Sequence, residues 1–252
     1  MKQLIQSTLK KLNLRIVKEG TYDNIPQEAT EFERFLINQC HQFSMTGNLR
    51  MWSIIQAIKH IKHNNIKGDL VECGVWKGAN LVLMQNMLEH LSLDNKKIYG
   101  YDTFEGMSDS SEFDVDFQDR EWTTFSKTIK RDEKVVNAWC VAGIELVRKL
   151  YNEFTNENNN LELIKGDVIE TLEKEANLPD KISLLRLDTD FYESTKKELE
   201  VLYPRLQKGG ILIIDDYGHW KGAKKAVDDY FTGEYHFMHV IDYTCRMIIK
   251  TE

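Results

Sequence analysis

Short apolar runs alternate with amphipathic stretches along the chain from about residue 45 onward. Such alternation is typical of strands joined by crossover helices, which build a parallel sheet. The apolar runs predict five strands, at residues 69–73, 97–102, 161–165, 182–187 and 210–214. We therefore expect an α/β protein whose core is one sheet covered by helices.

The spacing of apolar and capping residues predicts two helices. The first follows the strand at 69–73 and carries an apolar stripe at intervals of three and four, formed by Leu81, Met84, Leu88 and Leu91. Thr195 and Glu198 have the spacing of a capping box, which predicts a second helix that begins there and ends at Tyr203. The stripe of the first helix is expected to pack against the sheet.

The last segment of the chain predicts a β-hairpin. Residues 235–250 are rich in Tyr, Phe, Val and Ile without a helical period, which indicates two strands with Asp242 and Tyr243 near their turn. This hairpin would add antiparallel strands at one edge of the sheet.

Two regions do not fit the strand-and-helix repeat. Residues 1–44 mix polar and apolar positions and are expected to form a partly helical appendage. Residues 107–160, called the insertion below, are too long for an ordinary crossover and contain a predicted helix from about 136 to 154. The insertion is either a lid over a binding site or a solvated acidic loop. Its acidic residues include Asp109, Glu112, Asp114, Asp116 and Asp119.

Length and composition favour one domain. The 252 residues are 42% hydrophobic and contain no compositional break, so we expect a single domain over 1–252 with its core in 45–252. The formal net charge of -7 is unlike that of proteins that bind phosphate backbones. Nucleic acid is therefore not an expected partner.

Cysteine usage and hydropathy predict a soluble protein of the cytoplasm. The cysteines Cys40, Cys73, Cys140 and Cys245 are far apart and form no CxxC pair, so we expect reduced thiols rather than disulfides or a zinc cluster. The chain starts without the apolar run of a signal peptide, and no later segment is apolar enough to span a bilayer. A membrane partner is not expected.

Polar or glycine residues follow three of the predicted strands. Gly74 lies in a turn after the first strand, where glycine lets the backbone approach a ligand, although a purely structural turn explains it equally well. Asp102 ends the second strand, where an acidic side chain can accept hydrogen bonds from ribose hydroxyls or act as a turn residue. Gly166 and Asp167 follow the third strand. Three such endings along one edge favour a cofactor crevice.

Four aspartates follow the next two strands. Asp188 and Asp190 are two residues apart and share a face, and the neighbouring strand would bring Asp215 and Asp216 to the same rim. Carboxylates gathered in this way repel one another unless a cation lies among them, and all-oxygen ligands suit magnesium, calcium or manganese. The alternative is that these are turn and cap residues dispersed in solvent. His219 could reach the site or be a packing residue.

Four segments together resemble the macrocin O-methyltransferase family. They are VECGVWKGAN at 71–80, YDTFEGM at 101–107, LLRLDTDFYESTKKELEVLYPRL at 184–206 and GGILIIDDYGHWKGAKKAVDDYF at 209–231. The resemblance extends over 44–250 and implies a Rossmann-like methyltransferase fold, with a mostly parallel seven-stranded sheet and an antiparallel C-terminal hairpin. It also implies magnesium-dependent transfer of a methyl group from S-adenosylmethionine to a sugar hydroxyl, by a homodimer.

The resemblance assigns roles to individual residues. Those implied for the cofactor are Glu72 and Gly74 at the methionine end, Asp102 at ribose, Gly166 and Asp167 near adenine, and Met45 and Thr46 in a segment that closes over it. Those implied for catalysis are Asp188, Asp215 and Asp216 as ligands of Mg²⁺ or another divalent cation, and Asp190 as general base. Asp188 would act through the metal that acidifies the acceptor hydroxyl, and Asp190 would take its proton.

Other functions compete with this interpretation. An Asp-x-Asp pair such as Asp188 and Asp190 also occurs in metal-dependent glycosyltransferases, which would leave Glu72, Gly74 and Asp102 without a task. A non-catalytic cofactor-binding partner is a second alternative, and a dehydrogenase is disfavoured because no GxGxxG is present. Residues 1–40 and the insertion depart most from the family. The acceptor is therefore expected to be a small molecule with a hydroxyl, such as a sugar, without presuming a macrolide.

Overall fold

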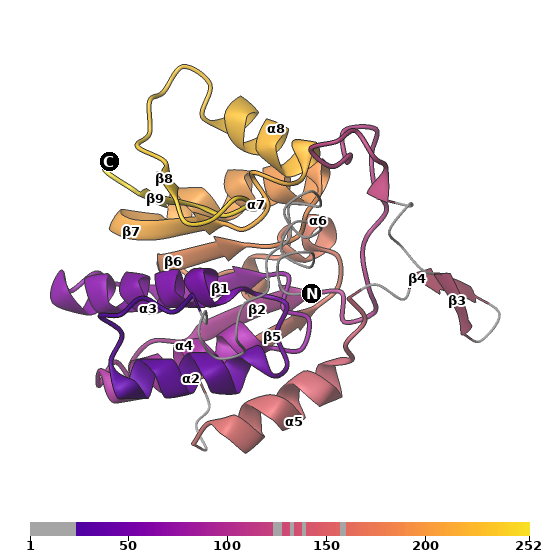
Figure 1. The fold of residues 1–252 in the computed structure, drawn as a ribbon. Coiled ribbons are helices and arrows are strands. Elements are labelled where there is room, and N and C mark those ends of the chain that lie inside the picture. The colour runs from indigo at the N-terminus through magenta and orange to yellow at the C-terminus, as the bar shows by residue number, and fades with distance from the viewer. Residues whose placement is uncertain (1–23, 123–127, 132–133, 138–139, 157–159) are drawn as a thin grey trace, which may run out of the picture.

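The computed structural model describes residues 24–122, 128–131, 134–137, 140–156 and 160–252. Seven strands form one sheet in the order β5-β2-β1-β6-β7-β9-β8 (Figure 1). The strands are β1 Asp69–Cys73, β2 Ile98–Asp102, β5 Leu161–Lys165, β6 Ile182–Leu187, β7 Leu206–Ile214, β8 His239–Val240 and β9 Arg246–Ile249. The first five strands of this order are parallel, and β9 and β8 are antiparallel. The predicted α/β fold, with its mostly parallel sheet and C-terminal hairpin, is confirmed.

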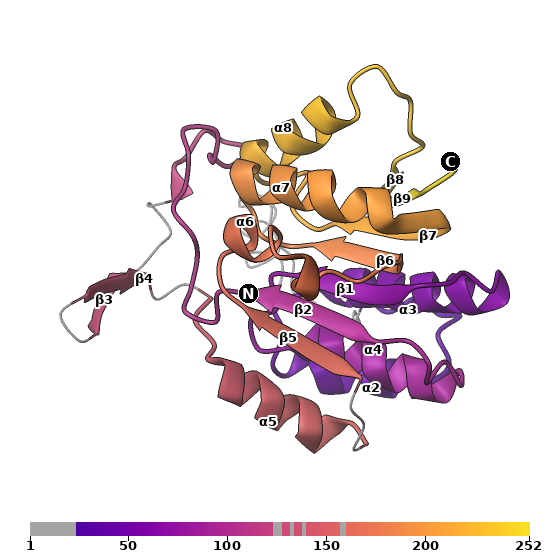
Figure 2. The same cartoon turned by 180° about the vertical axis from the view of Figure 1, so that it is seen from behind.

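Helices cover both faces of the sheet (Figures 1 and 2). One face packs against α2 Glu31–His41, α3 Asn48–His63, α4 Ala79–His90 and α5 Ile144–Phe154. The other face packs against α6 Val168–Thr171, α7 Tyr192–Leu202 and α8 Lys221–Tyr230, with the short 3-10 helices η2 Glu175–Asn177 and η3 Tyr203–Arg205 beside them. None of the helices in the described ranges is long and apolar enough to cross a membrane.

The register of the parallel strands aligns their carboxyl ends. Cys73 pairs with Tyr101 on one side and with Leu187 on the other, and Leu187 pairs with Ile214. The residues that follow these four positions therefore lie in one row. The chain order also reverses at β1, which has β2 on one side and β6 on the other. Open α/β sheets bind their ligands at such a switch point.

The predicted capping box at Thr195 is wrong. Helix α7 begins earlier, at Tyr192, and Phe191 is its N-cap residue. The Thr195 amide bonds the Phe191 carbonyl within the helix, and Glu198 is buried. The amide of Tyr192 is instead bonded by the Asp114 carboxylate, from a distant part of the chain. No local pattern reveals a cap of that kind.

The insertion differs from its prediction at one point. Its helix, α5, starts at Ile144 rather than near residue 136, because β4 Lys134–Asn137 pairs with β3 Thr128–Arg131 in a separate antiparallel ribbon. This ribbon projects away from the sheet (Figure 2). The β-branched pair Val135 and Val136 favours a strand over the start of a helix.

The predicted helical character of the N-terminal appendage is confirmed for α2. This helix has a complete capping box between Thr30 and Glu33. Residues 1–23 of the predicted appendage lie outside the described residues.

Candidate active site

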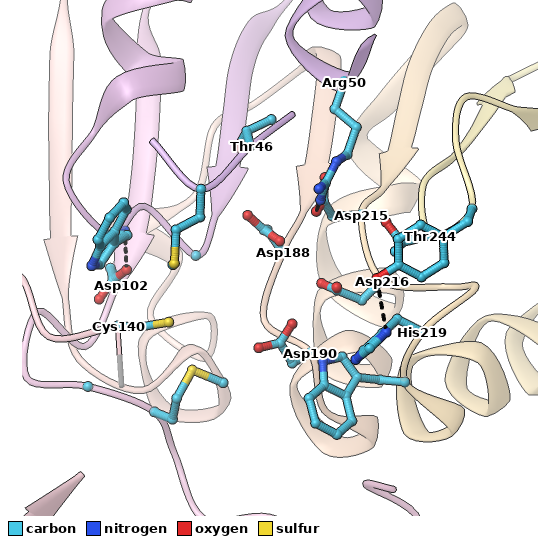
Figure 3. A pocket seen from close by; sticks show the side chains of 17 residues that line it. Thr46, Arg50, Asp102, Cys140, Asp188, Asp190, Asp215, Asp216, His219 and Thr244 are labelled. Carbon is cyan, nitrogen blue, oxygen red and sulfur yellow. Dashed lines mark hydrogen bonds and ion pairs between the residues drawn. The ribbon is translucent and has the colours of Figure 1, made fainter. Parts of the chain in front are cut away.

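The aligned strand ends surround a cavity of about 260 Å³ (Figure 3). It is lined by eight of the residues predicted from sequence: Met45, Thr46, Gly74, Asp102, Asp188, Asp190, Asp215 and Asp216. Gly166 lines a smaller adjoining pocket that shares Gly74, Asp102 and Asp188 with the first. Glu72 is buried behind the cavity. Asp167 caps α6, where its carboxylate accepts the Ile169 amide and the Ser108 hydroxyl.

The Gly74 turn fits closely against the start of the loop after β6. Gly74 has a φ of 83°, and a Cβ atom at this position would lie 2.0 Å from the backbone oxygen of Asp188. Only glycine permits that contact without moving one of the two backbones. The first and fourth predicted strand endings therefore form one continuous wall of the cavity.

Asp102 organises the turn that follows β1. One carboxylate oxygen accepts the backbone amides of Val75 at 2.8 Å and Trp76 at 2.9 Å, and the other accepts that of Phe104 at 2.6 Å. Burial raises the pKa of Asp102, although these amides favour its charged form. The side chain predicted to bind ribose thus also fixes the backbone around it.

Arg186 is the centre of a buried ion network that the sequence analysis missed. It lies on β6, is fully buried, and bonds Glu72 at 2.7 Å, Asp188 at 2.7 Å and Asp215 at 2.6 Å. Burial opposes its charge, but the three carboxylates raise its pKa well above the usual value. A signal was present in the sequence, because a charged residue inside an otherwise apolar buried strand requires partners.

Arg50 of α3 is a second cation that the sequence analysis missed. Its guanidinium contacts the second carboxylate oxygen of Asp215 and lies 3.1 Å from Asp242. Each oxygen of Asp215 therefore faces an arginine. Figure 3 shows Arg50 pointing from its helix toward Asp215.

Glu72 links the ion network to the segment around Thr46. Its bonded oxygen also accepts from the Asn80 amide at 2.8 Å, and the same amide lies 3.0 Å from the Thr46 hydroxyl. The other oxygen of Glu72 is buried and has no hydrogen-bond partner among the described residues. Burial raises the pKa of Glu72 to about 7.

The predicted carboxylate cluster comes together at the cavity floor. Asp188, Asp215 and Asp216 each contribute an oxygen that lies within 4.8 Å of the other two. Asp190 lies beside them and its side chain contacts that of Asp216. Burial and the neighbouring carboxylates raise the pKa of Asp190 to about 7 and that of Asp216 well above its usual value.

The donor set of this cluster fits a divalent cation. One oxygen of Asp216 is buried without a hydrogen-bond partner among the described residues. The two arginines can balance only two of the five carboxyl groups in the network, which are Glu72, Asp188, Asp190, Asp215 and Asp216. A hard cation with oxygen ligands would offset the remaining charge.

Aromatic side chains form the outer wall of the site. The ring of His219 lies 5.5 Å from that of Phe117 and 5.9 Å from that of Tyr243, and its Nδ1 is 3.3 Å from the Tyr243 hydroxyl. His219, Trp220 and Tyr243 line the cavity. Phe117 and Tyr243 are 51% and 66% exposed, so both offer apolar surface to an incoming molecule. His219 is thus an aromatic wall residue, and burial lowers its pKa.

The geometry agrees with the comparison with known families. A model of the macrocin-O-methyltransferase family matches residues 39–248. The chain belongs to the macrocin-O-methyltransferase family. It is therefore an O-methyltransferase, as the resemblance of its four segments implied.

Two relatives and one solved structure illustrate the similarity. The demethyldecarbamoylnovobiocin O-methyltransferase of Streptomyces niveus is 31% identical over 74% of this chain and 67% of its own length. The 8-demethyl-8-(2,3-dimethoxy-alpha-L-rhamnosyl)-tetracenomycin-C 4'-O-methyltransferase of Streptomyces olivaceus is 29% identical over the same shares. The structure of the O-methyltransferase NovP covers 83% of both chains with a TM-score of 0.70 and 28% identity.

The fold is that of S-adenosylmethionine-dependent methyltransferases. Solved methyltransferases that hold S-adenosylhomocysteine share it, with TM-scores of 0.50 and 0.51. Three alternative functions were considered from the sequence: a glycosyltransferase, a dehydrogenase and a non-catalytic cofactor-binding protein. Membership in the methyltransferase family favours none of them. The four cysteines, including Cys73 and Cys140 near the site, are free thiols.

Part of the insertion is attached firmly beside the site. Asp114 and Asp116 are buried, whereas the acidic neighbours Asp109, Glu112 and Asp119 are exposed. The Asp116 carboxylate binds the Arg120 side chain at 2.6 Å, and its backbone forms a bridge with Trp220. Two acidic residues therefore serve as internal acceptors and do not belong to a solvated acidic loop. They hold Phe117 against His219.

Proposed function

We propose that the cavity binds S-adenosylmethionine and a divalent cation side by side and transfers the methyl group to a sugar hydroxyl. One observation carries this proposal. The three-aspartate cluster, with its oxygens within 4.8 Å of one another, lines the same cavity as Gly74 and Asp102. A methyl donor on one side and a metal-bound hydroxyl on the other would then face each other across a short distance.

The cofactor would occupy the edge formed by β1, β2 and β5. Gly74 lines the cavity at the expected methionine end, Glu72 has an oxygen without a partner among the described residues, and Asp102 lies where ribose would bind. The smaller pocket beside Gly166 and the Asp167 cap suits adenine. Met45 and Thr46 line the cavity from the segment before α3, which supports their role in covering the cofactor.

Catalysis would depend on Asp188, Asp215, Asp216 and Asp190. The first three would hold Mg²⁺ or a similar cation, which lowers the pKa of an acceptor hydroxyl. Asp190, which lies beside these three aspartates, is suited to accept the hydroxyl proton. S-adenosylmethionine, when bound, would supply the methyl group to the acceptor oxygen and leave as S-adenosylhomocysteine. Alignment of the two reactants can supply about 7–11 kcal/mol of the barrier.

The acceptor would enter past the aromatic wall. One relative acts on the rhamnosyl group of a tetracenomycin, which supports a sugar as the methylated part. Phe117 and Tyr243 would pack against the ring or aglycone beyond that hydroxyl. The insertion would act as a lid on this side, because it carries Phe117. We expect residues 1–40, together with the insertion, to select the acceptor.

Two further properties belong to this proposal. We expect a homodimer, which analytical ultracentrifugation of the purified chain would detect as a species of twice the 29.5 kDa mass. We also expect the enzyme in the cytoplasm, where its free thiols stay reduced, which fractionation of the source cells would test.

Calorimetric titration with S-adenosylhomocysteine tests the central proposal. We expect binding with magnesium present and weaker or equal binding after chelation. The comparison variant is Gly74→Ala. Its added Cβ would overlap the Asp188 backbone, so we expect this variant to lose binding of S-adenosylhomocysteine. Absence of binding by the unmodified protein in both conditions would refute the proposed cofactor site.

A further inference from the structure

Glu198 is a buried carboxyl group that the proposed reaction does not use. It lies on α7, beside the apolar Leu199, and is fully buried. One of its oxygens accepts the Thr189 hydroxyl at 3.0 Å, and the other has no hydrogen-bond partner among the described residues. A buried carboxyl is costly unless its hydrogen bonds compensate, so an apolar residue would serve the core better. The hydrogen bond to Thr189 distinguishes Glu198 from an ordinary core residue.

Thr189 lies between the metal-ligand candidate Asp188 and the base candidate Asp190. Asp190 has a φ of 67°, in the left-handed region that aspartate adopts more readily than most residues, and the chain turns sharply there. The turn depends on Thr189, whose carbonyl accepts the amide of Phe191 at 2.8 Å. Whatever fixes Thr189 therefore fixes the direction of both aspartates.

Helix α7 lies against two of the polar groups of Thr189, its hydroxyl and its carbonyl. Glu198 accepts the Thr189 hydroxyl at 3.0 Å, and the Ser194 hydroxyl, which donates to the Phe191 carbonyl at 3.1 Å, lies 3.4 Å from the Thr189 carbonyl. Ser194 and Glu198 are four residues apart and so lie on one face of the helix. The Cys73 thiol, at the end of β1, also lies against the Glu198 carboxyl. The buried carboxyl thus joins the helix, the turn and the strand that precedes Gly74.

We infer that Glu198 clamps Thr189 through this hydrogen bond, and that Glu198 is a positioning residue that fixes the Asp188–Asp190 turn. Glu198 acts through Thr189 and contacts neither cofactor nor acceptor. The inference rests on the proposed function for the roles of the two aspartates. The clamp itself is a property of the fold, so it can be tested without substrate, metal or cofactor.

Hydrogen exchange of the full chain tests the clamp directly. Glu198→Leu and Thr189→Val each remove the hydrogen bond, whereas Glu198→Gln keeps an oxygen acceptor. We expect the peptide over 186–192 to exchange about tenfold faster in the first two variants and to approach the parental rate in the third. Glu200→Gln, an exposed position on the same helix, is the matched control. Unchanged exchange in both Glu198→Leu and Thr189→Val, or an equal rise along all of α7, would overturn the inference.

Metal affinity tests the consequence for the site. The probe is Mn²⁺, titrated into protein saturated with S-adenosylhomocysteine. We expect Glu198→Leu and Thr189→Val each to raise the Mn²⁺ Kd about tenfold, and the double variant to do little more, because both remove one contact. Glu198→Gln should restore the parental Kd. Parental Mn²⁺ binding by Glu198→Leu would refute the positioning role. If the unmodified protein bound no Mn²⁺, the metal site of the proposed function would be refuted, and the exchange experiment would still decide the clamp.

Discussion

The Asp114 carboxylate accepts a hydrogen bond from the backbone amide of Tyr192 at 2.7 Å, across 78 positions of the chain. Helix N-termini leave amides without partners, and a nearby side chain usually caps them. Here Phe191 occupies the cap position and has no polar side chain, so a residue of the insertion provides the cap. The helix that follows the Asp188–Asp190 turn is therefore held partly by the insertion.

Replacement of Asp114 should destabilise the protein at this helix end. Loss of a capping carboxylate costs about 0.5–2 kcal/mol, so we expect Asp114→Ala to lower the free energy of unfolding by that amount. Urea denaturation followed by circular dichroism measures it. Asp109→Ala, an exposed position of the same insertion, should leave stability unchanged. Equal stability of the two variants would contradict the capping role.

Removal of Arg186 should be among the most damaging single substitutions. Arg186→Met leaves Glu72, Asp188 and Asp215 without their shared cation, and breaking a buried ion network costs about 3–5 kcal/mol. Denaturant unfolding measures the loss. Arg205→Met removes an ion pair with the largely exposed Glu175 and should cost less than about 1 kcal/mol. Similar losses in both variants would contradict the network's importance.

Asp190→Asn should separate binding from turnover. The variant keeps its shape and the other carboxylates, so we expect calorimetry to detect unchanged affinity for S-adenosylhomocysteine. Turnover should fall by about 10²–10⁴, the usual contribution of a general base. Asp188→Asn, by contrast, should weaken Mn²⁺ binding. Parental turnover by Asp190→Asn would rule out Asp190 as the base.

Loss of the aromatic wall should weaken binding of the acceptor and leave binding of the cofactor unchanged. Phe117→Ala and Tyr243→Ala each remove an exposed ring beside His219. We expect KM for a methylated acceptor to rise about tenfold, since an aromatic contact contributes about 0.5–1.5 kcal/mol beyond its buried area. The Kd of S-adenosylhomocysteine should stay constant. An exposed ring away from the cavity, Tyr235, provides the control as Tyr235→Ala.

Glu198 should make stability depend on pH in a predictable direction. Burial raises the pKa of Glu198 from its ordinary value of 4.5 to about 8 in the folded protein. Below pH 4.5 both states hold the proton, whereas between pH 4.5 and about 8 only the folded state retains it. The free energy of unfolding should therefore fall across this window relative to Glu198→Gln, which has no such group. A constant difference between the two proteins from pH 4 to 9 would contradict the raised pKa.

The sequence predicted the strand ends well, because buried parallel strands are uninterrupted apolar runs and the next residue begins the ligand-facing edge. Asp102, Asp188 and Asp215 were found in this way, and the register of the sheet brings them into one row. Their roles were suggested by the resemblance to a family. Strands can be predicted in this way because their length and composition depend on the local sequence.

Contacts between distant segments could not be predicted in the same way. Arg50 meets Asp215 across 165 positions, and Asp114 meets Tyr192 across 78. Neither pair leaves a local pattern, because each depends on how separate elements pack. Thr195 and Glu198 had the spacing of a cap and turned out to be interior helix residues. Spacing alone does not distinguish a cap from two buried side chains one turn apart.

The contact between Gly74 and the Asp188 backbone sets a condition for engineering this enzyme. Since a Cβ at position 74 would lie 2.0 Å from the Asp188 oxygen, the two loops interlock as matched parts. A glycine turn grafted from another methyltransferase would have to be exchanged together with its own Asp-x-Asp turn. The two loops are therefore one unit for protein engineering, and chimeras should be cut outside both of them.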